Sequence, residues 1–150
     1  MLWIAIVLVL VSIDRYSKYL IVKNIEYGDR VSVIGDFFYL TNHDNYGAAW
    51  GMFQNGRYFF IAMTVIVSIV MIIYMTKTQS KFLKFTLSVI LGGAFGNLID
   101  RVYKGGVTDF LDFHFGSYNF PTFNAADMCA VAGTILLAIH MLFIYKEHKE

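Results

Sequence analysis

Four long apolar runs limit what this chain can fold into more than any other feature of its sequence. They cover about residues 2–22, 58–76, 82–102 and 126–145, and each is long enough, with its flanks, to cross a bilayer as a helix. Only 15% of the residues are charged and 57% are hydrophobic, whereas about 25% of a soluble domain is charged. We therefore predict a single membrane domain, residues 1–150, that is mainly α with four transmembrane helices.

The charges between these runs predict the orientation of the chain. The loop at 76–84 has no acid and contains three lysines, namely Lys77, Lys81 and Lys84. Short loops of this kind face the cytoplasm. We expect the first run to be retained, because the DRYSK sequence after its apolar core differs from the small-residue cleavage site of a secretory signal peptide. Four crossings then place both termini in the cytoplasm and the segments 23–57 and 103–125 on the outer surface.

The two outer segments hold most of the polar residues and are expected to form a small β platform. The stretch at 31–41 (VSVIGDFFYLT) is rich in β-branched and aromatic residues, which predicts a strand. The sequence after it, NHDNYGAAWGMF, predicts a turn and a short interfacial helix, with Trp50 and Phe53 at the level of the lipid headgroups.

A second strand is predicted at 107–115, where the faces of the strand alternate along the sequence VTDFLDFHF. Asp109 is the one polar residue on its face, which it shares with apolar side chains. We therefore expect its carboxyl group to be desolvated, with a raised pKa. Asp112 is on the other face with Thr108 and His114, where we expect it to be solvated.

Polar residues also lie inside the apolar runs, near their outer ends, where burial of a charge is costly. Asp14 and Lys18 are four residues apart, so they can pair on one face of the first helix. Asn97, Asp100 and Arg101 have the spacing of one helical stripe. Links between helices, or snorkelling of the two basic side chains to the interface, would also account for these residues.

The start of the last run, FPTFNAAD, allows two interpretations of its acid. Asn124 is a favourable N-cap, and Asp127 at the third helical position would complete a capping box and complement the helix dipole. Asp127 is also at the same membrane level as the other unusual acids, where it could take part in acid–base chemistry. The two roles do not exclude each other.

The acids and amides of the runs and outer segments converge on the outer membrane surface. Two carboxyl groups a few ångströms apart do not both ionise readily, so they can share one proton and act as general base and general acid. Such a pair can activate water for peptide hydrolysis, as in aspartic proteases. The converging residues are Asp14, Asn45, Asn97, Asp100, Asp109, Asn124 and Asp127.

Other kinds of chemistry have less support in the sequence. It contains no His-Glu-x-x-His zinc motif, and its single cysteine, Cys129, allows neither a cysteine-based metal site nor an intramolecular disulfide. Ser17 and Lys18 are adjacent on a helix and do not face each other. A proton-coupled carrier and a metal-dependent lipid-modifying transferase stay open as alternatives. The scarcity of acids and amides in the cytoplasmic half of every run argues against the carrier.

Five stretches resemble the bacterial lipoprotein signal peptidases of type II, and they occur in the order of that family. They are DRYSK at 14–18, NYGAAWG at 45–51, GGAFGNLIDRV at 92–102, GVTDF at 106–110 and FNAAD at 123–127. The resemblance implies a four-helix aspartic endopeptidase of the bacterial cell membrane. It would remove the signal peptide of a diacylglyceryl-modified prolipoprotein by cleaving before the lipidated cysteine, with neither a metal nor another cofactor.

The resemblance also implies roles for individual residues. The catalytic aspartates of the family fall on Asp109 and Asp127. Its supporting or substrate-binding residues fall on Asp14, Lys18, Asn45, Asn97, Asp100, Arg101 and Asn124. The chain departs from the family at Arg15, where glutamine is common, and at Trp50, where phenylalanine is common. The implied partners are prolipoproteins and membrane lipids. We expect the protein to be a monomer. We also expect it not to bind nucleic acid, because the formal net charge is +1 and no basic block is present.

Overall fold

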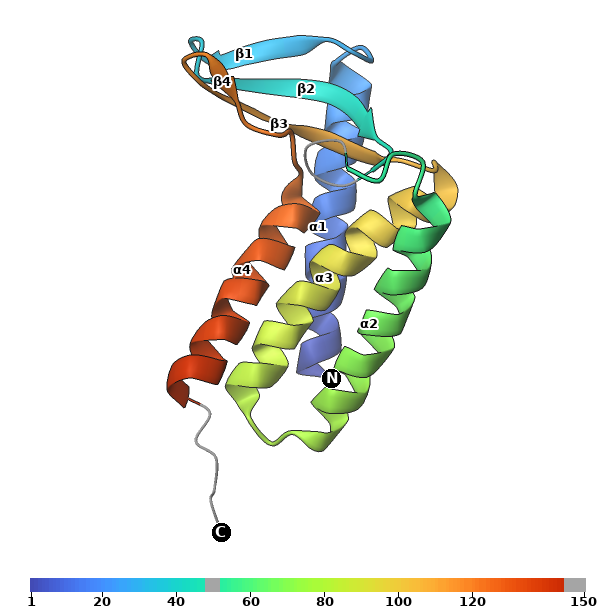
Figure 1. Cartoon of the computed structure of the whole chain (residues 1–150), viewed down its shortest axis with the longest axis vertical. Helices are drawn as coiled ribbons and strands as arrows, with labels where there is room; N and C mark the ends of the chain where they lie inside the picture. The colour runs from blue at the N-terminus through green and yellow to red at the C-terminus, as the bar shows by residue number, and fades with distance from the viewer. Residues whose placement is uncertain (48–51, 145–150) are drawn as a thin grey trace.

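The computed structural model of the chain describes residues 1–47 and 52–144. Its helices stand side by side, and a small sheet covers one end of them (Figure 1). The helices are α1 (Leu2–Asn24), α2 (Arg57–Lys77), α3 (Lys81–Tyr103) and α4 (Ala125–Ile139), and α4 continues into a π-helical turn, η2 (His140–Ile144). Each begins and ends close to the predicted residues, except that residue 145 lies outside the described ranges.

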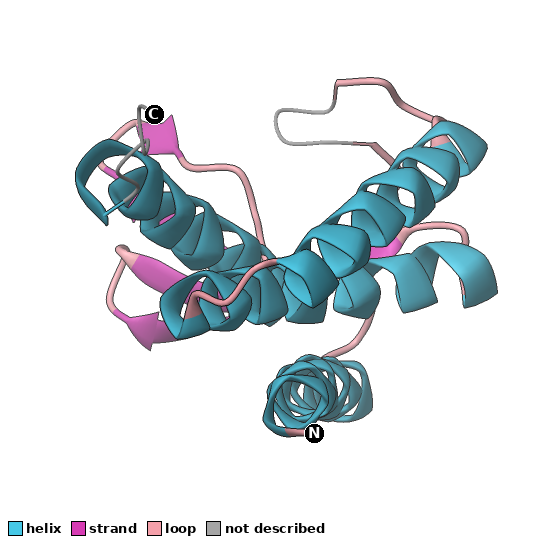
Figure 2. Ribbon diagram, turned by 90° about the horizontal axis from the view of Figure 1, so that it is seen from below, coloured by secondary structure: helices cyan, strands magenta, loops and turns pink. Residues whose placement is uncertain are grey.

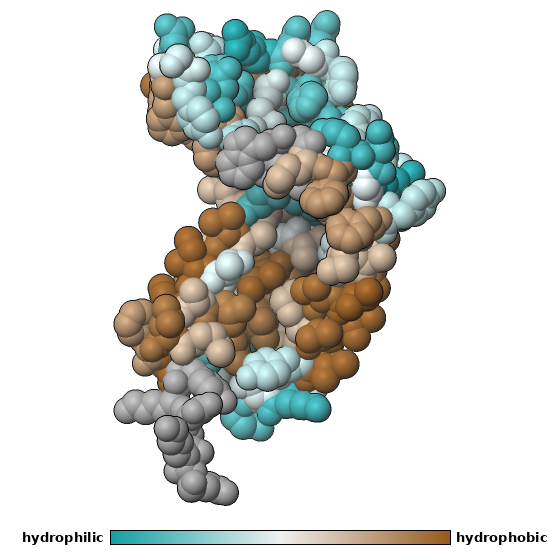
Figure 3. All heavy atoms as spheres, in the orientation of Figure 1, coloured by the Kyte–Doolittle hydropathy of each residue, from teal (hydrophilic) through white to brown (hydrophobic). Residues whose placement is uncertain are grey.

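Among the described residues, three helices are long and apolar enough to cross a bilayer, namely α2, α3 and α4 with its extension to Ile144. Hydrophobic side chains form a band over the helices, and polar side chains gather on the sheet and at the opposite end (Figure 3). Helix α1 has 23 residues, but Asp14, Arg15 and Lys18 lie within its second half. Its crossing of the membrane stays a prediction, as does the orientation of the chain.

Helix α3 is the central element and contacts α1, α2 and α4. Figure 2 shows α1, whose start is marked N, on one side of the other helices. Glycines on α3 allow close approach: a methyl group on Gly92 would lie 2.8 Å from Cβ of Leu10, and one on Gly96 would lie 2.6 Å from Oδ2 of Asp14. Larger residues at these two positions would push α1 away from α3.

The sheet is antiparallel, with strand order β1-β2-β3-β4. Its strands are β1 (Arg30–Ile34), β2 (Phe38–Asn45), β3 (Val107–Phe115) and β4 (Tyr118–Asn119). The strand predicted at 107–115 is confirmed as β3. The single strand predicted at 31–41 is wrong, because the chain turns back at Gly35 and makes a hairpin. Gly35 has a φ of +45°, a conformation that glycine adopts without the steric cost of a Cβ atom.

The interfacial helix predicted after the first strand falls partly on residues 48–51, including Trp50, which lie outside the described residues. On either side of this gap the structure shows β2, which extends to Asn45, and a turn at 52–55. The helix therefore stays a prediction.

A short β-bridge joins the start of α4 to the sheet. The backbone N–H of Leu111 donates to the carbonyl oxygen of Phe123 at 2.9 Å, and the N–H of Phe123 donates back at 3.1 Å. Asn124, the next residue, is therefore held beside β3. Ile21 of α1 and Ile25, the residue that follows this helix, form a small apolar cluster with Phe110 of β3, which fixes the sheet on the helix ends.

Candidate active site

Two carboxyl groups, those of Asp109 on β3 and Asp127 on α4, line one pocket of about 670 Å³. Asn45, Asn97 and Arg101 line the same pocket. These residues come from β2, β3, α3 and α4, so the site forms where the sheet meets the helix ends (Figure 1). The structure thus brings five of the predicted site residues to one cavity.

Asp109 is only 2% exposed, and each of its oxygens accepts one side-chain amide hydrogen bond. Asn45 pairs with Val107 in the sheet and so lies diagonally across from Asp109. Its Nδ2 donates to Oδ2 of Asp109 at 3.0 Å, and Nδ2 of Asn124 donates to Oδ1 at 2.7 Å. The predicted desolvation of Asp109 is confirmed.

Burial, and after it the nearby charge of Asp127, raise the pKa of Asp109 to about 7. The hydrogen bonds from Asn45 and Asn124 and the charge of Lys18 act in the opposite direction, because they favour the ionised form. Burial is the largest of these causes. A carboxyl group with a pKa of about 7 can both hold and release a proton near neutral pH.

The prediction that Asp112 is solvated is wrong. Asp112 is 9% exposed, and its Oδ1 lies 2.9 Å from Nε2 of His114. The alternation of β3 correctly separates Asp109 from Asp112, but both faces of the strand are largely covered along its first half.

Asp127 lies in the first turn of α4 and has two amide donors of its own. Nδ2 of Asn97 donates to its Oδ1 at 2.7 Å, and the backbone N–H of Asn124 donates to its Oδ2 at 3.2 Å. The backbone N–H of Asp127 in turn donates to Oδ1 of Asn124 at 3.0 Å. The predicted N-cap and capping box are therefore confirmed.

Asn124 connects the two acids directly. Its side chain is fully buried, at 0% exposure. The amide nitrogen donates to Asp109, while the amide oxygen and the backbone N–H bond to Asp127. One residue thus fixes the positions of both carboxyl groups relative to the start of α4.

A buried network of charges lies next to this pair, centred on the ammonium group of Lys18. Nζ of Lys18 lies 2.9 Å from Oδ2 of Asp14 and 2.8 Å from Oδ2 of Asp100, and it donates to Oδ1 of Asn97 at 3.0 Å. The predicted pairing of Asp14 with Lys18 is confirmed. Arg15 also pairs with Asp100, although its own side chain is 40% exposed, so the two buried acids face one buried and one partly exposed basic group.

The network also holds the backbone around the site. Oδ1 of Asp14 accepts the N–H of Ala126 in the first turn of α4 at 3.0 Å. Oδ2 of Asp100 accepts the N–H of Thr108 at the start of β3 at 3.4 Å. Asp14 and Asp100 therefore attach α1 and α3 to the two elements that carry Asp109 and Asp127.

Arg101 lies apart from this network, although it shares a predicted stripe with Asn97 and Asp100. Its guanidinium group is 4.8 Å from the ring centre of Phe60, and Nη2 donates to the carbonyl oxygen of Gly47 at 3.4 Å. Arg101 thus supports the segment that follows β2 and presents a positive charge to the pocket.

Sequence reasoning missed the role of Arg15, which was noted only as a departure from a family pattern. Its partner, Asp100, is 85 residues away, so local spacing gave no signal of the pair. The only sequence signal for this ion pair is that Arg15 lies near the same membrane level as Asp14, Lys18 and Asp100.

The fold and the site together define a helical membrane protein with a buried pair of carboxyl groups beneath a small sheet. The family model described as signal peptidase (SPase) II matches residues 6–143. The lipoprotein signal peptidase of Bacillus pumilus is 44% identical over 152 positions, which cover 100% of this chain and 98% of the relative.

Two solved structures of bacterial membrane enzymes have the same fold. The first has a TM-score of 0.87 and 36% identity, and the match covers 99% of this chain and 93% of the other. The second has a TM-score of 0.85 and 36% identity, with 95% and 94% covered. The chain belongs to the signal peptidase II family and is a peptidase of the bacterial membrane. Membership favours hydrolysis over the carrier and the transferase.

Proposed function

We propose that this protein is an aspartic endopeptidase that removes signal peptides from diacylglyceryl-modified prolipoproteins, with Asp109 and Asp127 as its catalytic pair. The observation that carries the proposal is that both carboxyl groups line one pocket and are bonded to the same residue, Asn124. The similarity to a lipoprotein signal peptidase supports the substrate class.

In the proposed mechanism the pair holds one proton, with Asp109 protonated and Asp127 ionised. Asp127 removes a proton from a water molecule as the water attacks the scissile carbonyl carbon, and Asp109 donates its proton to the carbonyl oxygen. The tetrahedral intermediate then collapses, the peptide C–N bond breaks, and the proton held by Asp127 passes to the leaving amine. The new carboxyl group of the signal peptide returns a proton to Asp109.

The surroundings of Asp127 support its role as the base. A lysine ammonium group only donates hydrogen bonds, so Lys18 fixes the oxygen of the Asn97 amide on its own side. The amide nitrogen of Asn97 is then directed at Asp127, to which it donates at 2.7 Å. Lys18 thereby orients the amide of Asn97 toward Asp127 without contacting the acid.

The same donors argue against metal catalysis at this pair. The groups that contact the two carboxyl groups are amide N–H donors, which direct hydrogen atoms rather than lone pairs at the carboxylate oxygens. A divalent cation is bound by oxygen or nitrogen lone pairs. The pair is therefore suited to proton transfer.

The pocket offers an apolar path for the lipid of the substrate. Besides the acids, it is lined by side chains of α4 from Met128 to Ile135 and by Phe120 and Phe123. Seven residues of helix correspond to roughly 10 Å along the axis of α4. A diacylglyceryl group could lie along this path while the scissile bond reaches Asp109.

The test is cleavage of a lipidated precursor by purified protein in vesicles. We expect Asp109→Asn and Asp127→Asn each to lower kcat by roughly 10²-fold or more, the usual contribution of an acid–base group. Asp112→Asn, which changes a buried acid on the other face of β3, is the matched control and should cleave normally. Cleavage at the wild-type rate by either catalytic variant would overturn the assignment.

A second arm tests the substrate class and the absence of a metal. The same precursor without its diacylglyceryl group should be cleaved poorly. A chelator should leave the rate unchanged, and a rate restored only by an added divalent cation would contradict the mechanism.

A further inference from the structure

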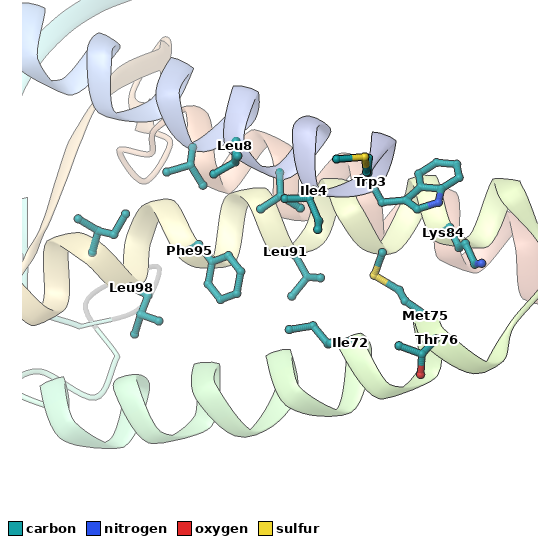
Figure 4. Close-up of a pocket in the computed structure, with 14 residues that line it drawn as sticks. Trp3, Ile4, Leu8, Ile72, Met75, Thr76, Lys84, Leu91, Phe95 and Leu98 are labelled. Atoms are coloured by element: carbon teal, nitrogen blue, oxygen red, sulfur yellow. The ribbon is translucent and has the colours of Figure 1, made fainter.

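A second cavity lies between α1, α2 and α3, and it shares none of its lining residues with the pocket of Asp109 and Asp127. We call it the α1–α3 groove; its volume is about 790 Å³. Figure 4 shows apolar side chains from the three helices facing its interior. The labelled ones include Leu8, Ile72, Leu91 and Phe95. Nothing in the proposed peptidase reaction uses this space.

The groove is apolar along its length but has a cationic group at one end. Lys84 lies at this end, together with Thr76 and Trp3, whereas Leu98 lies toward the other end (Figure 4). Lys84 is half-buried. It belongs to the acid-free stretch that also contains Lys77 and Lys81. In the part of the chain that the structure describes, none of these three lysines has an ion pair.

We propose that the α1–α3 groove binds one molecule of an anionic glycerophospholipid, with an acyl chain among the three helices and its phosphate at Lys84. Charge complementarity selects the headgroup, because basic residues between membrane helices bind anionic lipid headgroups. Thr76 lines the same end of the groove, but its hydroxyl group already donates to the carbonyl oxygen of Ile73 at 2.7 Å, so Lys84 is the group that selects the phosphate.

The length of the groove fits one leaflet. Lys84 and Leu98 are separated by 14 residues of one helix, which is roughly 21 Å along the axis of α3. Half of a bilayer's hydrocarbon core is about 15 Å thick, so an acyl chain that starts at Lys84 can lie entirely within the groove. Helix α2 is held mainly by α3, and a lipid in this position would fill the space between α2 and α1.

The prolipoprotein lipid is a poorer candidate for this site. Its scissile bond must reach the pocket beneath the sheet, whereas Lys84 lies at the opposite end of α3 (Figure 1). The lipid proposed for the groove therefore comes from the leaflet on the side of the α2–α3 turn. Its binding does not depend on the proposed catalytic pair.

Trp3 provides a direct probe, because it lines the groove. The chain has two tryptophans, so Trp50→Phe leaves Trp3 as the only one. The full chain is reconstituted in phosphatidylcholine vesicles that contain increasing fractions of phosphatidylglycerol with brominated acyl chains, which quench tryptophan fluorescence. Brominated phosphatidylcholine is the reference. We expect brominated phosphatidylglycerol to reach half-maximal quenching at a lipid fraction about fivefold lower than brominated phosphatidylcholine needs. This factor corresponds to the attraction between one lysine and an anionic lipid.

Two pairs of variants distinguish binding of the lipid in the groove from a general attraction of anionic lipid to the basic surface of the protein. Lys84→Gln should abolish the preference for the anionic lipid, whereas Lys81→Gln, at an exposed lysine outside the groove, should keep most of it. Val11→Phe, which fills part of the groove, should weaken quenching by the anionic lipid. Val9→Phe, the same change at an exposed position of α1 that does not line the groove, should not.

Equal quenching by the two lipids would overturn the proposal. So would equal effects of the two lysine variants, since a diffuse surface charge would respond to both alike. The readout is lipid contact, so a failure here is distinguishable from a failure of the catalytic assignment.

Discussion

Asp109→Asn should abolish cleavage and yet make the protein more stable at alkaline pH. The pKa of Asp109 is about 7 in the folded protein and about 3.9 in an unfolded chain. Because folding raises this pKa, the contribution of Asp109 to stability is complete below about pH 4. It is then lost progressively as the pH rises to 7. The difference corresponds to about 4 kcal/mol at pH 8.

Asparagine does not ionise, so the variant avoids this loss. It has a cost of its own, because both oxygens of Asp109 accept amide hydrogens, and the new NH₂ group would face one of those donors. A lost hydrogen bond of this kind costs about 1 kcal/mol. The variant should therefore be more stable than the wild type by about 3 kcal/mol at pH 8.

The assay is the free energy of unfolding in mild detergent, measured for both proteins at pH 5 and pH 8. The difference between variant and wild type should grow by about 3 kcal/mol over this range. Asp36→Asn, at an exposed acid in the hairpin turn, controls for the removal of one acid from the chain. A difference between Asp109→Asn and the wild type that does not change between pH 5 and pH 8 would refute a buried, proton-holding Asp109.

Two further predictions concern the groups around the pair. Lys18→Met should destabilise the protein by about 3–5 kcal/mol, because it leaves Asp14 and Asp100 buried with one basic group fewer. Thermal unfolding measures this loss of stability. A variant as stable as the wild type would show that water reaches the network. Asn124→Ser should keep the helix cap, since serine caps about as well as asparagine, but its shorter side chain should no longer donate to Asp109. Losing that bond raises the pKa of Asp109, so the pH above which the cleavage rate falls should be higher in the variant than in the wild type. An unchanged pH limit would mean that Asn124 serves only as a helix cap.

Patterns that depend on local spacing predicted much of this structure. The apolar runs gave the helices, and the four-residue spacing of Asp14 and Lys18 gave their ion pair. The sequence around Asn124 gave the capping box because its hydrogen bonds join residues only three positions apart. The desolvation of Asp109 followed from the period of the strand, because its neighbours on the same face are apolar.

Features that depend on tertiary packing were not predictable in this way. The period of β3 shows which residues share a face but not which faces are covered, so the burial of Asp112 was missed. The hairpin at Gly35 was missed because the strand-forming residues on both sides outweighed one glycine. The bond from Asn124 to Asp109 and the pairing of Arg15 with Asp100 both join different elements, and neither has a signature in local sequence.

The central claim is that Asp109 and Asp127 share one proton that takes part in cleavage. The most direct test is the pH dependence of kcat/KM for cleavage of a lipidated precursor by the full chain in vesicles. We predict a bell-shaped profile whose alkaline limb has an apparent pKa near 7, the value for Asp109. A rate that stays constant from pH 6 to about pH 9 would contradict a catalytic proton on Asp109.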